Sequence, residues 1–576
     1  MDRRLGNRRH PKSSSLLTIA ASPCLMGSKA YAWRVRFIAF ASGAAVMGVE
    51  LMASRLFAPA FGDSIFVWGS LIGVIMLALA AGYWLGGRRA DRNSSYMELS
   101  NIVLAAGAFV LAIPWAAPYV LELIRRVGLG DVYGPLLASA LLLTGPTVLL
   151  GMVSPYAVRL SAGDVVSLGS VSGGLSTINT AGSIFGTFFT VFVLIPVFGT
   201  REIITSLGVL LVLVSLVGRD LRDKLFLVLL VALLLLPEAL VGGRLRVLGG
   251  TAVYRRETPY STMTVVDNEG AGIRYMFLND MAHSLMYLNG STRAAARYTD
   301  YFNLAFGFNP AIRDVLFIGG GGFSAPKQFL DQYPWVNVDV VEIDPYVVEA
   351  AYDYFAVPRN EPRLHVYIMD GRSFLDQAGS YDLVVLDAYS HTYVPFHLMT
   401  LEFHQLLRSH LNSGGVLASN LIGSFVGDTS ELLWCEVETV TQVYPQVHLF
   451  STVRASDAVV RNIAMVASSD PEPVTAEEFT SNISSALGDI RRVLAYYRTL
   501  YTGEPFGRRL VLVDNFAPVD TLLNPVTLTR YEESGQLREA SLVNPLVLAG
   551  LWALSMVMVH KASSTWAKQR APEAQP

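Results

Sequence analysis

The chain has 576 residues, of which 52% are hydrophobic and only 16% are charged. Soluble domains carry roughly 25% charged residues, so this composition argues against a wholly soluble protein and for a large part in lipid. The net charge of −3 at pH 7 argues against nucleic acid as a partner. The length allows two or three domains.

The cysteines and histidines give no sign of a disulfide framework or a metal site. Cys24 and Cys435 are the two cysteines, and they are far apart in the sequence. The nine histidines show no HExxH or similar spacing. We therefore predict two ordinary thiols and no structural metal.

The first 36 residues are rich in Lys and Arg. Their one apolar patch, Leu16–Ala21, is weaker than the core of a usual signal peptide. We expect residues 1–36 to be a disordered cytoplasmic leader, or else to follow from a start codon assigned too far upstream. They are left out of the fold prediction.

From Phe37 onward the sequence alternates apolar runs of membrane-spanning length with short charged connections. We predict a transmembrane bundle of about seven helices over residues 37–245, then a soluble domain over 251–540 and a C-terminal transmembrane helix over 541–560. The predicted spans are Phe37–Phe57, Ile65–Leu85, Asn101–Val120, Leu136–Val153, Leu175–Val197, Ile203–Val217, Leu225–Val241 and Leu542–Val559.

Lys and Arg in short loops favour the cytoplasm, which places the leader and the connection Arg88–Arg92 inside the cell. Alternation through seven spans then puts the soluble domain outside. Ile203–Val217 has about 15 residues, fewer than the roughly 17 needed to cross. If it does not cross, the soluble domain lies in the cytoplasm. The sequence predicts an integral protein of a bacterial-type plasma membrane and leaves the side of the soluble domain open.

Two features of the bundle favour a transporter-like role. Glu50 lies inside the first predicted span, where a carboxylate faces either a cation site or a polar partner such as Asn179 or Thr180. The segment Gly82–Arg92 resembles the loop between the second and third helices of major facilitator transporters. A glycine-rich helix end followed by arginines is equally typical of any tight cytoplasmic turn.

The first parallel strand of the soluble domain is predicted within Asp314–Gly322. This apolar run ends in the glycines Gly319, Gly320, Gly321 and Gly322. A helix is predicted over Ser324–Tyr333, and a second strand over Val338–Pro345 ends in carboxylates. Glycines allow a ligand to approach the backbone closely, and an acidic residue at the second strand end accepts hydrogen bonds from a ribose. Glu342 is the best-placed carboxylate, followed by Asp344.

Two further strand ends complete this pattern. Asp370 and Gly371 follow the run His365–Met369, where they are placed to contact the amino group of a nucleotide base. Asp387 follows Tyr381–Leu386. In open parallel sheets the ligand crevice lies at the carboxyl ends of the strands, so all four strand ends point to one nucleotide site.

The run from Tyr254 to Leu523 resembles the spermidine synthase family, the polyamine aminopropyltransferases. Its strand ends match the family core, and Val394–Phe403 and Asp514–Asp520 resemble later family segments. The resemblance implies a Rossmann-like class I methyltransferase fold with a small N-terminal β-hairpin domain. Fused to the predicted bundle, this gives a polytopic α-helical membrane bundle plus an α/β domain.

The resemblance also implies residue roles. Glu342 would hold the ribose, Asp370 and Gly371 would contact the adenine, and the glycines would pass beneath the sulfonium side chain. Asp387 would face the incoming amine as a catalytic residue. The remaining substrate-side positions that match family segments are His283, Tyr298, Asp300 and Tyr389.

Departures from the family pattern lie on the amine side. Gly322 stands where the family has an Asp that binds cationic groups, and Ser390 replaces the usual acidic base. His391 follows it and is a candidate substitute base, although a solvated loop histidine is the alternative. His283 stands at the place of a family glutamine. Two carboxylates are thus lost near the amine while the nucleotide side is kept, which predicts an unchanged donor and a different acceptor.

Three functions remain open. The first is a membrane-tethered transferase that uses decarboxylated S-adenosylmethionine to modify an amine in polyamine biosynthesis. The second is an S-adenosylmethionine-dependent methyltransferase, since the same fold serves both. The third is a transporter-like bundle with a non-catalytic nucleotide sensor. The expected partners are a small-molecule amine and membrane lipid, with no nucleic acid, and the family resemblance implies a homodimer.

Overall fold

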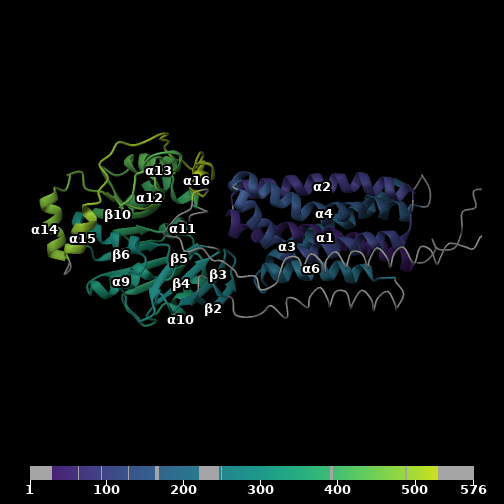
Figure 1. Cartoon of the computed structure of the whole chain (residues 1–576), viewed down its shortest axis with the longest axis horizontal. Coiled ribbons are helices and arrows are strands. Elements are labelled where there is room, and N and C mark those ends of the chain that lie inside the picture. The colour runs from purple at the N-terminus through teal and green to yellow at the C-terminus, as the bar shows by residue number, and fades with distance from the viewer. Residues whose placement is uncertain are drawn as a thin grey trace, which may run out of the picture.

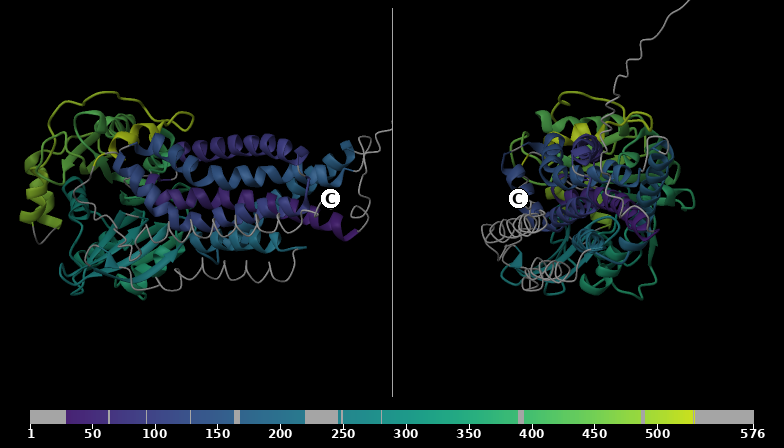
Figure 2. Two further views of the ribbon diagram at one scale, coloured as in Figure 1. Left: turned by 45° about the vertical axis from the view of Figure 1, so that its right-hand side comes forward. Right: turned by 90° about the vertical axis from the view of Figure 1, so that its right-hand side faces the viewer.

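The computed structural model describes residues 29–527 and 529, except 63, 93, 128, 163–167, 219–245, 248–249, 280, 389–393 and 487–489. The predicted spans Leu225–Val241 and Leu542–Val559 lie outside these residues. Figure 1 shows a helical bundle and an α/β domain placed end to end along the long axis of the molecule, and the left-hand view in Figure 2 shows the same arrangement.

The bundle consists of long apolar helices that lie side by side. Among the described residues, five helices are long and apolar enough to cross a membrane: Tyr31–Phe61, Ile65–Arg92, Tyr96–Ile124, Val132–Ser161 and Leu168–Leu194. The full helices are α1 (Lys29–Phe61), α2 (Ile65–Arg92), α3 (Tyr96–Val127), α4 (Gly130–Ser161), α5 (Leu168–Phe189, continued by a π-helical turn over Thr190–Leu194) and α6 (Thr200–Ser215).

Small residues let these helices approach closely. A Cβ atom added at Gly82 of α2 would lie 2.3 Å from the Val148 carbonyl oxygen of α4. One added at Gly182 of α5 would lie 2.1 Å from the Phe40 carbonyl oxygen of α1. Helices that cannot use the hydrophobic effect in lipid depend on such tight backbone contacts. The segment Gly82–Arg92 is thus the packed end of α2, helical to Arg92, and differs from the loop that its transporter resemblance implies.

The short helix α6 belongs to the bundle although it has only 16 residues. Its buried face, which includes Ile203, Leu207 and Leu211, packs against α1 and α3. Glu50 of α1 forms no hydrogen bond or ion pair with the residues that the structure describes, so the predicted bond to Asn179 or Thr180 is not formed.

The α/β domain begins with a five-stranded antiparallel sheet in the order β1-β2-β3-β4-β5. One face of this sheet is apolar, and its residues Met263, Val265, Met276 and Met286 pack against Val347 and Phe355 of the neighbouring layer. The strands are β1 (Arg246–Val247), β2 (Gly250–Glu257), β3 (Thr262–Asn268), β4 (Ile273–Leu278) and β5 (Met281–Tyr287).

The main sheet has seven strands in the order β11-β12-β10-β9-β6-β7-β8. The first five in sequence pair in parallel, and β12 is antiparallel to both of its neighbours. This arrangement confirms the expected Rossmann-like class I methyltransferase fold. The strands are β6 (Asp314–Ile318), β7 (Asn337–Glu342), β8 (Leu364–Ile368), β9 (Tyr381–Leu386), β10 (Leu411–Gly423), β11 (Gln446–Ser451) and β12 (Arg461–Ser468).

Helices pack on this sheet and connect its strands. Two apolar clusters form the core, one around Phe317 and Phe329 and the other around Leu386 and Phe403. The helices are α8 (Ala305–Phe308), α9 (Ser324–Gln332), α10 (Pro345–Tyr354), α11 (Gly371–Leu375), α12 (Leu401–Ser409), α13 (Glu431–Thr441), α14 (Ala476–Ala486), α15 (Ile490–Tyr497) and α16 (Val519–Thr527). Short 3-10 helices span Arg297–Leu304 (η2), Phe396–Leu398 (η3) and Asp428–Ser430 (η4).

Candidate nucleotide and amine site

The glycine turn after β6 is pressed between the main sheet and the antiparallel sheet. Gly319 has φ +97°, a conformation that favours glycine, and a Cβ atom there would lie 2.4 Å from the Asp387 carbonyl oxygen. At the other side of the turn, the backbone N–H of Gly322 donates to Ser284 Oγ at 2.7 Å. Ser284 belongs to β5, so the antiparallel sheet closes one side of the turn.

The carboxylate of Glu342 lies directly against this turn. Its Oε2 atom accepts hydrogen bonds from the backbone N–H groups of Gly320 at 3.0 Å and Gly321 at 3.1 Å. Its Oε1 atom accepts from the N–H of Asp344 at 3.1 Å. Burial raises the pKa of Glu342, and these three hydrogen bonds oppose that rise. The end of β7 thus presents a carboxylate at the glycine turn, as a ribose contact requires.

Asp344 lies behind Glu342. It is only 2% exposed, and its Oδ1 atom accepts from the N–H of Tyr346 at 3.0 Å, which caps the N-terminus of α10. Burial raises the pKa of Asp344, while the neighbouring Thr258 side chain and hydrogen bonds from the backbone lower it. The predicted direct contact of Asp344 with a nucleotide does not fit this position, because the carboxylate is buried against protein. Asp344 instead supports the position of Glu342 and caps α10.

Asp370 and Gly371 begin helix α11 at the end of β8. The Oδ1 atom of Asp370 accepts from the N–H of Ser373 at 2.9 Å, and its Oδ2 atom lies 2.9 Å from Nε2 of His397. Burial acts to raise the pKa of Asp370, but the bonds from Ser373 and His397 outweigh it and hold the pKa below its usual value. Asp370 is therefore a fixed anionic acceptor at neutral pH.

Asp387 follows β9 and is held by two neutral side chains. Its Oδ2 atom accepts from the hydroxyl of Tyr298 at 3.1 Å, and its Oδ1 atom accepts from Nδ2 of Asn420 at 3.0 Å. Burial raises the pKa of Asp387 to about 7, against the lowering effect of both hydrogen bonds. A carboxyl group with a pKa near neutrality is suited to exchange a proton with an amine.

Asn420 has a second feature on the same side. It is 4% exposed, and its Oδ1 atom has no hydrogen-bond partner among the residues that the structure describes. Buried amide oxygens are almost always hydrogen-bonded, so this acceptor beside Asp387 is an unsatisfied one. It can receive an N–H group from a bound amine.

The other predicted amine-side residues fall into three positions. Tyr298 contacts Asp387 directly. His283 lies half-buried on β5, and burial lowers its pKa to about 4, so it is neutral at physiological pH. Tyr389 and His391 lie outside the described residues, and their roles stay predictions.

Asp300 has a different place from the one that the resemblance implies. Its carboxylate accepts hydrogen bonds from Gln328 and from the Tyr496 hydroxyl, and it lies 3.4 Å from Nε of Arg492. It is two residues from Tyr298 in a 3-10 helix with three residues per turn, which points the two side chains in different directions. Asp300 joins η2 to α9 and α15, and its contacts indicate a structural role in place of substrate binding.

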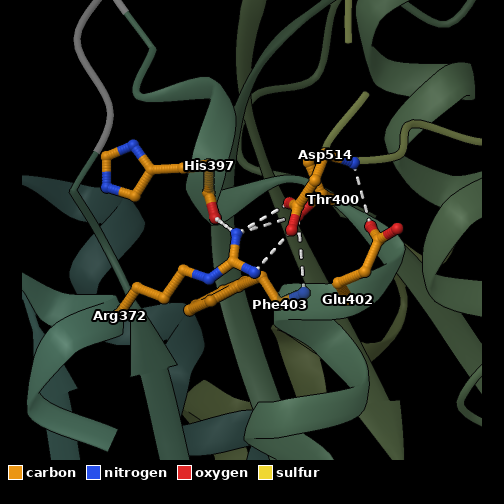
Figure 3. A network of polar contacts seen from close by, with 6 residues as sticks. All are labelled: Arg372, His397, Thr400, Glu402, Phe403 and Asp514. Atoms are coloured by element: carbon orange, nitrogen blue, oxygen red, sulfur yellow. Dashed lines mark hydrogen bonds and ion pairs between the residues drawn. The ribbon is translucent and has the colours of Figure 1, made fainter. Parts of the chain in front are cut away.

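A second network anchors the segment that follows residues 389–393 (Figure 3). Arg372 in α11 donates two parallel hydrogen bonds of 2.7 Å to the carboxylate of Asp514. It also donates to the His397 carbonyl oxygen at 3.2 Å, while Thr400 donates to Asp514 at 2.7 Å. The arginine holds the pKa of Asp514 down at about 2. This network fixes α11, and with it Asp370, to residues that come far later in the sequence.

Tyr260 was not singled out by the sequence pattern. It lies in the turn between β2 and β3, is 55% exposed, and its pKa is raised by burial and then by the nearby carboxylates of Asp344, Glu342 and Asp370. A position near three strand-end carboxylates puts Tyr260 at the edge of the nucleotide site. A polar turn residue gives no signal of this kind in the sequence, because the contact depends on how the two sheets pack.

Within the part of the chain that the structure describes, no group of three or more His, Cys, Asp or Glu side chains is arranged to hold a metal ion. The site is therefore built from carboxylates, backbone N–H groups and neutral polar side chains. Such a set can bind a ribose, a base and an amine.

The α/β domain is similar to known proteins. The model of the spermine/spermidine synthase domain matches residues 299–453. A polyamine aminopropyltransferase of Vibrio vulnificus (strain CMCP6) is 32% identical over 222 residues, which cover 37% of this chain and 71% of that protein. Putrescine N-methyltransferase 4 of Nicotiana tabacum is 29% identical over 154 residues, which cover 25% of this chain and 37% of that protein.

Among solved structures, a probable spermidine synthase from Corynebacterium glutamicum ATCC 13032 aligns with a TM-score of 0.36 and 19% identity. The alignment covers 41% of this chain and 87% of that one. The match to the family model lies wholly within the α/β domain, and the bundle helices α1 to α6 lie outside it.

Proposed function

The chain belongs to the spermine/spermidine synthase family, and from this we propose that it is a membrane-tethered transferase that moves an aminopropyl group from decarboxylated S-adenosylmethionine to an amine. The donor, when bound, supplies an aminopropyl group attached to a positively charged sulfur. Transfer forms a bond between the amine nitrogen and the aminopropyl carbon and breaks the bond from that carbon to sulfur. The sulfur leaves as the neutral thioether 5′-methylthioadenosine, and the amine loses one proton.

The residues that the structure brings together fit such a donor. The glycine turn supplies a backbone surface without side chains. The Oε2 atom of Glu342 lies 3.0 Å from the backbone nitrogen of Gly320 in that turn. Asp370 is held in its anionic form at the end of the next strand. These groups lie at the carboxyl ends of neighbouring parallel strands, where ligands bind in open α/β sheets. We assign the ribose to Glu342 and the adenine to Asp370 and Gly371.

The main support for the proposal is the environment of Asp387. It lies beside the glycine turn, and its pKa of about 7 allows it to accept a proton at neutral pH. The amine must be neutral to attack, so a carboxylate of matched pKa both attracts the ammonium form and removes its proton. Tyr298 and Asn420 fix the two oxygens, so that the carboxylate is oriented before the amine binds.

The acceptor is proposed to differ from a standard diamine. The described side chains that hydrogen-bond Asp387 are both neutral, and Ser390 stands at the position of a second family acid. A diamine has two positive charges to neutralise, and a site with one carboxylate satisfies only one of them. The amide oxygen of Asn420 is a neutral acceptor for a further N–H group. These features favour an amine with a single charged nitrogen near Asp387.

A second candidate is methyl transfer, which the similarity to putrescine N-methyltransferase 4 of Nicotiana tabacum favours. Both reactions need the same amine nucleophile and the same base, and they differ in the carbon that is attacked. The products separate them. Full-length protein in detergent would be given either donor with a panel of amines, and the nucleoside product identified by mass spectrometry. Release of 5′-methylthioadenosine supports aminopropyl transfer, and release of S-adenosylhomocysteine from S-adenosylmethionine supports methyl transfer.

A further inference from the structure

The turn between β2 and β3 contacts two helices of the bundle. The guanidinium of Arg55, near the end of α1, donates to the carbonyl oxygen of Thr258. The carboxylate of Glu257 accepts from the N–H of Thr200, the first residue of α6. Helices α1 and α6 also pack against each other. Neighbouring residues of one turn are therefore fastened to two helices that form one packed unit, and Figure 1 shows this end of β2 and β3 beside the bundle.

Thr258 continues from this contact into the nucleotide site. It is 1% exposed, and its Oγ1 atom accepts from the N–H groups of Tyr260 at 3.1 Å and Ser261 at 3.0 Å, which fixes the turn. Its side chain also lies beside the buried carboxylate of Asp344 and lowers the pKa of that group. The turn that carries Tyr260 to the edge of the site is thus the turn that Arg55 holds.

The last steps lie within the site. The backbone N–H of Asp344 donates to Glu342 Oε1 at 3.1 Å, and Glu342 Oε2 accepts from the glycine turn. A series of contacts therefore runs from Arg55 through Thr258 and Asp344 to Glu342. Packed polar networks can couple distant sites, and substitutions along the network measure whether they do.

A separate contact holds the opposite part of the α/β domain. The Oδ2 atom of Asp520, in α16, accepts from the backbone N–H of Ile65 at the start of α2, at 3.2 Å. Helix α16 also packs against α4. The described part of the domain therefore contacts the bundle both at the β2–β3 turn and at α16, so that a shift of α1 relative to α2 acts on the β2–β3 turn.

We propose that the membrane bundle sets the nucleotide affinity of the α/β domain, and that Arg55 and Thr258 are the positioning residues through which it does so. This inference rests on the proposed function of the site, because it takes Glu342 to be a ribose ligand. Arg55 keeps Thr258, and therefore Asp344 and Glu342, in the geometry that binds the donor. The bundle then acts as more than an anchor, because a change in the packing of α1 and α6 changes donor binding.

The test measures binding of 5′-methylthioadenosine to the full-length protein in detergent by titration calorimetry, with the KM for donor and kcat as further readouts. Arg55→Ala is expected to raise the Kd and the donor KM about tenfold, since a hydrogen bond from a charged group is lost, while kcat at saturating donor stays within about twofold. Arg55→Lys is expected to recover part of the affinity. Arg126→Ala, which removes an exposed arginine paired with Glu122 in α3, is the matched control and leaves Kd unchanged.

A second pair of variants tests the same series of contacts without touching the bundle. Thr258→Val removes the hydroxyl beside Asp344, and Thr258→Ser keeps it. Thr258→Val is expected to weaken nucleotide binding about as much as Arg55→Ala, and Thr258→Ser to leave it nearly unchanged. If Arg55→Ala does not fold, the two Thr258 variants still test whether this turn controls nucleotide affinity.

The outcomes separate the two proposals. If the unmodified protein binds no 5′-methylthioadenosine, the proposed function of the site fails. If it binds the nucleotide and neither Arg55→Ala nor Thr258→Val changes the Kd, the coupling is overturned and the proposed function stands. If both variants lower kcat and leave Kd unchanged, the series of contacts supports chemistry, and the proposed control of affinity is wrong.

Discussion

The hydroxyl of Tyr298 donates a hydrogen bond of 3.1 Å to the Oδ2 atom of Asp387, across 89 residues of sequence. Tyr298 comes from a 3-10 helix that precedes the main sheet, and Asp387 ends its central strand β9. Burial raises the pKa of Asp387 to about 7, although the hydrogen bonds from Tyr298 and Asn420 both act to lower it. The two residues therefore decide together at which pH the carboxylate is ready to receive an amine.

Replacing Tyr298 by Phe should move the pH profile of the enzyme. The unmodified protein should show a kcat/KM that rises with pH through about 7, because the ionised form of Asp387 is the active one. The substitution removes a hydrogen bond that favours the ionised form of Asp387, so the pKa of Asp387 rises. The rise of kcat/KM should therefore shift to higher pH by about half to one unit. A profile that stays in place or moves to lower pH would contradict this assignment.

Asp387→Asn should abolish turnover and leave nucleotide binding intact. The amide keeps the size of the side chain but cannot accept a proton, so kcat should fall on the order of 100-fold or more. The Kd for 5′-methylthioadenosine should stay within about twofold, because the nucleotide is assigned to Glu342 and Asp370. Asp376→Asn, at an exposed position after α11, serves as the control and should leave both quantities unchanged. Full turnover in Asp387→Asn would rule out Asp387 as the proton acceptor, whereas nucleotide binding without any turnover in the unmodified protein would favour a non-catalytic nucleotide sensor.

Glu342→Gln should weaken nucleotide binding about tenfold, since a charge-assisted hydrogen bond to the ribose is replaced by a neutral one. The raised pKa of Glu342 adds a pH dependence. Affinity of the unmodified protein should rise as pH increases through that pKa and the carboxylate ionises, whereas affinity of the Gln variant should be flat over the same range. Glu349→Gln, which alters an exposed carboxylate paired with Arg256, is the matched control. Equal affinities in the two variants would remove Glu342 from the ribose contact.

Arg372→Ala should lower the melting temperature by releasing Asp514 and the segment around His397. The arginine lowers the pKa of Asp514 to about 2, so its contribution is present above the unfolded value of about 3.9 and is lost as pH falls toward 2. The difference in melting temperature between variant and unmodified protein should therefore be larger at pH 7 than at pH 3. Arg359→Ala, at the exposed pair with Asp353, should cause little change at either pH. A difference that grows on acidification would contradict the role given to this ion pair.

Much of the nucleotide side could be predicted from the sequence, because it follows from local pattern. An apolar run followed by glycines specifies a strand and a turn, and β6 and α9 begin where the sequence places them, at Asp314 and Ser324. Glu342 ends β7 as predicted. These features depend on neighbours within a few residues, so a single sequence contains the information.

The amine side depends on contacts between distant segments. Asn420 reaches Asp387 because β10 lies beside β9 in the sheet, and a polar residue within β10 does not by itself reveal that contact. Asp300 shows the reverse case: a carboxylate at a family position points instead to Gln328 and Tyr496, because the 3-10 helix turns it away. The direction of a side chain follows from packing, and the sequence pattern does not specify it.

Release of 5′-methylthioadenosine is the most direct sign of aminopropyl transfer at Asp387. Full-length protein in detergent would be incubated with decarboxylated S-adenosylmethionine and a panel of amines, with Asp387→Asn in parallel, and products followed by mass spectrometry. We predict 5′-methylthioadenosine together with one amine that has gained an aminopropyl group, and neither product from the variant. If the unmodified protein binds nucleotide but releases no 5′-methylthioadenosine with any amine tested, or if the variant releases as much, the proposed aminopropyl transfer at Asp387 is contradicted.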